Sequence, residues 1–189
     1  MNIFDVELIT ARIKLRRISH EDLADMYEFT SIKSVTEFLE WDAHKSIVPT
    51  KEFISKTLNE YITKETTFTW GIEYLEHSKL VGTIRIYDYV PKYGRAEVSY
   101  IINPAYQGKG IMTEVLRQIY YHCFNNLRML RLQAKCSAKN LGSIKLLQKS
   151  GMVEEGCLRN YYSAHGIIHD SYVFAITSDN YFSLNGINK

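Results

Sequence analysis

This sequence of 189 residues has few of the features that mark specialised protein classes. Its only cysteines are Cys123, Cys136 and Cys157, which are odd in number and far apart. That spacing fits neither a disulfide framework nor a metal site, and it is typical of reduced thiols. No apolar run is long enough to span a bilayer, and the first five residues lack the basic and apolar regions of a signal peptide. We therefore expect a cytoplasmic protein without a membrane segment and without a bound metal.

The chain also has few prolines and little net charge. Three prolines, no internal repeat and no low-complexity segment give no sign of a linker, so we expect one domain over 1–189 with its core over 9–177. The net charge is +2 and the basic residues are scattered, which argues against general nucleic-acid binding. Fourteen tyrosines could stack on bases, but their spacing without interleaved basic residues favours a place in the core.

What the sequence does contain is an alternation of strand and helix patterns. Ser19 and Asp22 have the spacing of a capping box, Asn140 is a good helix cap, and Gly151 is placed to end that helix. This order predicts an α/β protein with a mixed sheet. Strands are expected at 9–18, 68–75, 80–89, 95–102, 129–137, 152–159 and 167–177, and helices after Asp22, from Pro49, after Gly110 and over 141–150.

The most informative segment is Gln107–Met112, because it lies between a predicted strand and an amphipathic helix. A glycine-rich turn that opens a helix presents unpaired backbone N–H groups and the positive end of the helix dipole. This arrangement suits a phosphate, and Lys109 adds a positive charge beside it. The glycine spacing matches neither a Walker-type loop nor a dinucleotide-binding fingerprint. The segment therefore predicts a different phosphorylated ligand.

This segment resembles the Gln/Arg-x-x-Gly-x-Gly/Ala signature of the GNAT superfamily of acyl-CoA-dependent N-acetyltransferases. Gln107 and Gly110 match the signature, whereas Met112 departs from its final Gly or Ala. The order of predicted elements is also that of the GNAT fold. The resemblance implies a GNAT-type, mostly antiparallel sheet of about seven strands with about four helices.

The downstream half extends the resemblance over about 9–177. Ser137–Ser143, Gln148–Met152 and Glu155–Arg159 are similar to the Asn-x-x-Ser…Gly-Phe…Glu-Gly…Arg pattern of a subgroup that includes the ribosomal-protein-alanine N-acetyltransferases. Glu37–Trp41 is also similar to that subgroup.

The resemblance implies that acetyl-CoA is the cosubstrate. Backbone N–H groups of the loop would hold the CoA pyrophosphate, an N–H near Ile101 or Ile102 would polarise the acetyl carbonyl, and Asn140 would bond the CoA arm. A plain helix cap is the alternative for Asn140. The implied cofactor-binding set is Ile101, Ile102, Gln107, Gly108, Lys109, Gly110, Ile111, Met112, Asn140 and Ser143.

The catalytic groups are less well defined. Many relatives place a tyrosine as proton donor where this chain has Leu147, so Ser143 becomes the candidate donor to the CoA sulfur. Glu97 is the first candidate for the general base, and His44 is the second. A solvent-facing role remains the alternative for both, and His165 ranks below them.

We expect direct transfer of an acetyl group to a primary amine. An α-amino group has a pKa of about 7.7–8.0, so deprotonation near pH 7.5 costs well under 1 kcal/mol, against about 4 kcal/mol for a lysine. No strong base is evident, which favours the N-terminal α-amine of a protein such as a ribosomal protein. A polyamine or aminoglycoside acceptor, a non-catalytic acyl-CoA-binding module and a homodimer are left open.

Overall fold

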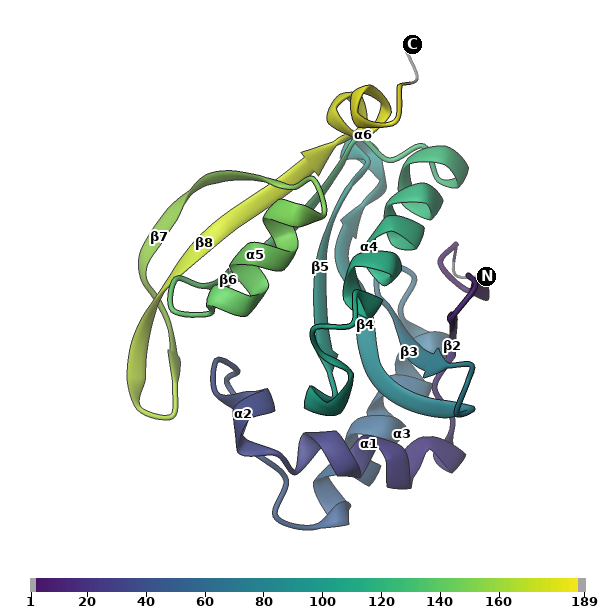
Figure 1. Cartoon of the computed structure of the whole chain (residues 1–189), viewed down its shortest axis with the longest axis vertical. Coiled ribbons are helices and arrows are strands. Elements are labelled where there is room, and N and C mark those ends of the chain that lie inside the picture. Colours follow the sequence, from purple (N-terminus) through teal and green to yellow (C-terminus); the bar gives the residue numbers. More distant parts are fainter. Residues whose placement is uncertain (1–2, 187–189) are drawn as a thin grey trace.

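The computed structural model describes residues 3–186 and contains one eight-stranded sheet at its centre. The strand order is β1-β2-β3-β4-β5-β6-β8-β7, and within 3–186 only β5 and β6 pair in parallel. Helices α4 and α5 lie on the near side of the sheet and α3 on the far side (Figure 1). The strands are β1 (Leu8–Ile9), β2 (Ile13–Arg17), β3 (Phe68–Tyr74), β4 (Lys79–Val90), β5 (Arg95–Ile102), β6 (Arg131–Ser137), β7 (Val153–Ala164) and β8 (Ile167–Thr177), and the helices are α1 (Leu23–Thr30), α2 (Lys33–Thr36), α3 (Ile47–Thr63), α4 (Ile111–Tyr121), α5 (Leu141–Lys149) and α6 (Ser178–Leu184).

The predicted fold class and element order are confirmed, with differences in number and length. The described residues form eight strands and six α-helices, against about seven and four expected. The expected first strand over 9–18 is interrupted, because Thr10 turns the chain by bonding Ile13 through its backbone N–H (2.9 Å) and its side chain. Helix α3 begins at Ile47 rather than at Pro49, since proline in a first turn removes no helical hydrogen bond.

The helix caps predicted at Ser19, Asp22 and Gly151 are confirmed. Ser19 and Asp22 form the reciprocal capping box ahead of α1. Gly151 ends α5 with φ +98°, in the left-handed region that favours glycine. Strand β7 instead runs past its expected end at Arg159, because a bulge at Asn160 (φ +50°) shifts the register and pairing with β8 then resumes.

The main core lies between the sheet and α4, whose apolar residues recur at helical spacing. Leu116 and Ile119 of α4 pack in the same buried cluster as Trp70, Val98 and Leu132 of the sheet. A smaller cluster joins α1 and α3 to β4. Packing on the sheet therefore fixes the position of α4, and with it the loop that precedes the helix.

Candidate active site

The parallel strands β5 and β6 pair only at their first residues. Their register runs from Arg95 opposite Arg131 to Glu97 opposite Gln133, and beyond that point the strands separate. Strand β5 remains paired to β4 as far as Ile102. The other edge of β5 therefore presents backbone N–H and C=O groups that no strand satisfies, which is an edge that an extended ligand can pair with.

The glycine-rich loop ends beside this open edge. Gly108 and Gly110 have φ +73° and +77°, and Gly110 is the N-cap of α4. Glu114 donates its N–H to the Gly110 carbonyl at 3.1 Å, which leaves the preceding N–H groups of the first turn for a ligand. Arg12 holds the loop from outside, because its Nη1 donates to the Lys109 carbonyl at 3.0 Å and its Nη2 pairs with Glu114 at 2.5 Å.

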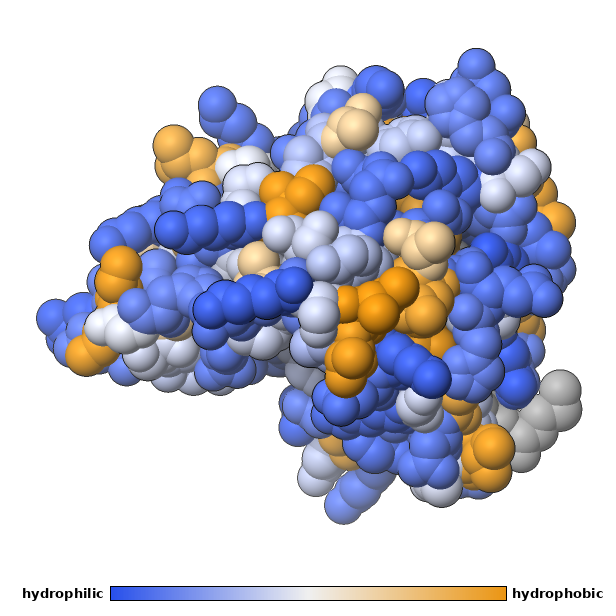
Figure 2. Space-filling view, turned by 90° about the horizontal axis from the view of Figure 1, so that it is seen from below, coloured by the Kyte–Doolittle hydropathy of each residue, from blue (hydrophilic) through white to orange (hydrophobic). Residues whose placement is uncertain are grey.

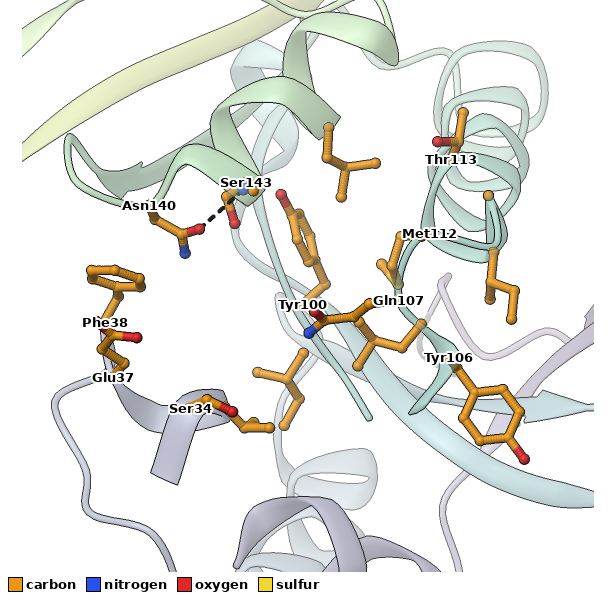
Figure 3. Close-up of a pocket in the computed structure, with 18 of the residues that line it drawn as sticks. Ser34, Glu37, Phe38, Tyr100, Tyr106, Gln107, Met112, Thr113, Asn140 and Ser143 are labelled. Atoms are coloured by element: carbon orange, nitrogen blue, oxygen red, sulfur yellow. Dashed lines mark hydrogen bonds between the residues drawn. The ribbon is translucent and has the colours of Figure 1, made fainter. Parts of the chain in front are cut away.

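A cavity of about 570 Å³ connects the loop to the open edge of β5. We call it the donor cavity. Figure 3 shows Gln107 and Met112 on one side of it and Asn140 and Ser143 on another. Lys109 does not line it, and its ammonium lies 5.1 Å from the centre of the Tyr106 ring. The predicted cofactor-binding residues that do line the cavity are Ile101, Ile102, Gln107, Gly108, Gly110, Ile111, Met112, Asn140 and Ser143.

Met112 is only 6% exposed and belongs to the main core as well as to the cavity wall. The methionine side chain, which stands where the signature has Gly or Ala, therefore fills volume in the core. Leu147, where many relatives have a tyrosine, is fully buried and supplies no hydroxyl group.

Asn140 and Ser143 form the start of α5 at the cavity. The Asn140 Oδ1 accepts from the Ser143 N–H at 3.0 Å (Figure 3), so the helix-cap role of Asn140 is confirmed. Its amide nitrogen stays available for a ligand. The Tyr100 hydroxyl is buried beside them and makes no hydrogen bond within 3–186. Burial raises the pKa of Tyr100, and the neighbouring Ser143 opposes that rise in part.

Glu97 does not line the donor cavity. It is 5% exposed, and its carboxylate accepts from the Tyr87 hydroxyl and from Gln133 Nε2 at 2.9 Å and pairs with Lys135 Nζ at 3.0 Å. Burial lowers the pKa of Lys135, but the hydrogen bonds that its ammonium donates to Tyr161 and Glu97 outweigh that effect and raise the pKa overall. Both carboxylate oxygens of Glu97 are thus engaged with neighbouring side chains.

His44 lines neither the donor cavity nor the second cavity described below. Its Nδ1 lies 2.7 Å from the Thr50 hydroxyl, and its ring packs against Trp41 with centroids 5.0 Å apart. Burial lowers the pKa of His44. The roles of His44 and Glu97 as bases stay predictions.

A second cavity, of about 700 Å³, lies between the α2 region and the β7–β8 hairpin. It shares Ser34, Glu37 and Phe38 with the donor cavity. His165, at the hairpin tip, has its pKa raised by the Thr36 carbonyl and by Asp42. This cavity is lined by Lys33, Ser34, Glu37, Phe38, Lys139, Ala164, His165, Ile167 and His169. The sequence pattern did not single it out, because its two walls come from opposite ends of the chain.

The residues of the donor cavity fit acetyl-CoA. The free N–H groups at the α4 N-terminus suit the pyrophosphate, and the unpaired edge of β5 suits the amide groups of the pantetheine arm. Within 3–186, no group of three or more His, Cys, Asp or Glu side chains is placed to hold a metal ion. No helix in that range is both long and apolar enough to cross a membrane.

Comparison with known proteins agrees with this fold. The family model described as "Acetyltransferase (GNAT) domain" matches residues 12–153. The N-acetyltransferase YoaA of Bacillus subtilis, itself uncharacterised, is 30% identical over 169 residues, which cover 89% of this chain and 95% of YoaA. The chain belongs to the GNAT family. It is an N-acetyltransferase that uses acetyl-CoA as its donor.

Other relatives act on different acceptors. The ribosomal-protein-serine acetyltransferase of Escherichia coli is 27% identical over 44% of this chain and 47% of its own length. The spermidine N(1)-acetyltransferase of Escherichia coli is 23% identical over 82% of this chain and 80% of its own length.

Solved structures support the fold. The structure of a GNAT-family acetyltransferase from Bacillus anthracis superimposes on this chain with a TM-score of 0.82 and 21% sequence identity. The match covers 92% of this chain and 99% of the other. RimL, a ribosomal L7/L12 α-N-protein acetyltransferase in complex with coenzyme A, covers 93% and 99%, with a TM-score of 0.82 and 18% identity.

Proposed function

We propose that this enzyme acetylates the N-terminal α-amine of a protein such as a ribosomal protein. The observation that carries the proposal is the charge of the two cavities. Glu37 is the only carboxylate among their lining residues, whereas Lys33, Lys139 and Lys149 supply three ammonium groups. A polyamine carries further positive charges beside the reacting amine, so such a lining repels it.

A peptide is compatible with the shape of the same region. The two cavities share one wall, so an extended acceptor can reach the donor from the second cavity. Seen from below, the smaller lobe with β7 and β8 joins a larger body, and both have a largely hydrophilic surface (Figure 2). An α-amine also needs little help to lose its proton near pH 7.5.

The proposed reaction is direct transfer. The loop 107–112 holds the pyrophosphate, and the backbone N–H of Ile101 or Ile102 stabilises the oxyanion that forms when the amine attacks the thioester. The C–N bond forms, the C–S bond breaks, and CoA leaves as a thiolate that receives a hydrogen bond from Ser143. Asn140 donates to the CoA arm through its amide nitrogen.

A thiol-release assay with acetyl-CoA tests the proposed function. We expect release with peptides that begin with Ala, Ser or Met, and faster release when the next residues are acidic than when they are lysines, because the lining is net positive. Spermidine and an aminoglycoside serve as the small-amine panel. Faster turnover of spermidine than of every peptide would favour a small-amine enzyme, and no release above hydrolysis with any amine would favour a non-catalytic module.

Replacement of Ser143 by Ala tests its proposed role as hydrogen-bond donor to sulfur. We expect kcat to fall by about 10- to 100-fold, because one donor to a developing charge is lost. The affinity for acetyl-CoA should change little, since the Ser143 backbone N–H that Asn140 caps is retained. Ser183→Ala, an exposed serine of α6, is the matched control. A wild-type kcat in Ser143→Ala would remove Ser143 from the reaction.

A homodimer stays a prediction, and the sedimentation coefficient of the full chain measures it.

A further inference from the structure

His169 is a buried imidazole that faces the second cavity and has no part in the reaction described so far. It lies on β8, is 4% exposed and contributes to the cavity lining. Its Nδ1 lies 3.1 Å from the Ser137 Oγ. Its ring stacks on Tyr162 with centroids 5.1 Å apart and meets Phe38 edge-on at 6.1 Å. Three neighbours thus fix the orientation of the ring.

The other ring nitrogen of His169 is left for a ligand. Within 3–186, Nε2 has no hydrogen-bond partner, yet this nitrogen is not completely buried. Because His169 lines the second cavity, Nε2 opens onto that cavity. Ser137 Oγ also accepts from the Lys139 backbone N–H at 3.2 Å. When Nδ1 donates its proton to Ser137 Oγ, Nε2 holds a lone pair that points to the cavity.

The charged and titratable groups around His169 come from every element that packs on it. The α2 region contributes Lys33 and Glu37, the loop after β6 contributes Lys139, and the hairpin tip contributes His165. Tyr162 of β7 donates its hydroxyl to the Phe38 carbonyl at 3.0 Å, and burial raises the pKa of Tyr162.

We propose that His169 accepts the proton of the acceptor amine, with its Nε2 as the base. The inference rests on the proposed function, because it requires an amine in the second cavity. The amine nitrogen forms its bond to the acetyl carbon and passes a proton to Nε2. The C–S bond breaks and its electron pair leaves with CoA. The proton on Nε2 then passes to water, so the enzyme returns to its starting state.

The position of His169 connects the two cavities. Ser137, which orients the ring, lies at the end of β6, and Asn140 of the donor cavity follows three residues later. Phe38, which contacts the ring, lines both cavities. By contrast, both oxygens of Glu97 are occupied by other side chains. A general base needs a free lone pair to accept the proton that it removes. Nε2 of His169 has such a lone pair.

His169→Gln is the first test, because glutamine can bond Ser137 but cannot take up the proton. We expect kcat/KM for the acceptor peptide to fall by about 100-fold, at the lower end for general base catalysis because the α-amine is weakly basic. The affinity for acetyl-CoA, measured by calorimetry, should be unchanged. The matched control is His20→Gln, which replaces an exposed histidine far from His169 in the sequence. This variant should keep wild-type activity.

His169→Ala tests the role in a way that a merely structural residue would not satisfy. Added imidazole should raise the rate of the His169→Ala variant about tenfold or more. This rescue should follow the concentration of neutral imidazole as pH rises. Wild-type kcat/KM in His169→Gln, or an absence of rescue in a folded His169→Ala that still binds acetyl-CoA, would overturn the proposal. A 100-fold loss in Glu97→Gln with none in His169→Gln would assign the base to Glu97. Failure of the wild-type enzyme to acetylate any peptide would instead contradict the proposed acceptor.

Discussion

Gly110→Asp should lower the affinity for acetyl-CoA by about 100-fold. A carboxylate at this position lies at the start of α4, where the pyrophosphate is expected. Two like charges 4 Å apart repel by about 4 kcal/mol at an effective dielectric constant of 20. Arg12 Nη2 lies 3.7 Å from the position of the added Cβ and offsets part of that repulsion. Apart from the adjacent residues of the chain, no other heavy atom lies within 4 Å of this Cβ, so the effect comes from charge rather than from a clash within the protein.

Two variants separate charge from backbone strain at Gly110. Gly110→Ala adds only a Cβ at φ +77° and should cost about 1–2 kcal/mol of stability while acetyl-CoA binding stays within about tenfold of wild type. Gly186→Asp has a similar φ of +69° and open space around its Cβ, but it lies after α6. It should leave binding unchanged. Calorimetric titration with acetyl-CoA measures all three, and wild-type affinity in Gly110→Asp would contradict the assignment of the loop.

The second large effect is expected from Gly82→Ala in β4. A Cβ at Gly82 would lie 2.4 Å from the Ile101 carbonyl oxygen and 3.0 Å from the Ile102 Cα. Both are backbone atoms of β5, which cannot rotate away, so β5 itself must move. Such overpacking costs about 1–3 kcal/mol of stability. Because Ile101 and Ile102 are proposed to orient the acetyl group, we expect kcat to fall by about 10- to 100-fold.

Gly71→Ala is the matched control for Gly82→Ala. The Cβ added at Gly71 would lie 2.6 Å from Leu80 Cδ1, the end of a flexible side chain, and it would leave β5 in place. It should lower the melting temperature with little effect on kcat. Thermal unfolding and acetyl-transfer assays on both variants give the comparison. A Gly82→Ala protein that loses stability but keeps its kcat would show that the backbone of β5 takes no part in catalysis.

Local sequence signals predicted the elements whose ends depend on neighbouring residues. The strand over 95–102 was predicted with the bounds that the structure has, because turn residues flank it on both sides. Asn140 was recognised as a cap because its side chain bonds an N–H only three residues away. The loop 107–112 was recognised because glycines before an amphipathic helix form a local pattern.

Features that depend on contacts between distant parts of the chain were not predicted from the sequence. Nothing in residues 33–38 indicates that they face the hairpin tip, yet His165 Nε2 lies 2.8 Å from the Thr36 carbonyl across 129 residues of chain. The engagement of Glu97 is a similar case, because its partners come from β4 and β6. A single charged residue in an alternating strand does not reveal whether its oxygens will be free or occupied.

The sequence by itself determined the family, the acetyl-CoA donor and the loop proposed to bind its pyrophosphate, because these depend on short motifs and on the order of elements. Only the tertiary structure decided that β5 and β6 separate after Glu97, that Met112 fills the core, and that His169 opens onto a second cavity. Each of these depends on side chains and backbones that approach from distant parts of the chain, and packing of the sheet against its helices brings them together.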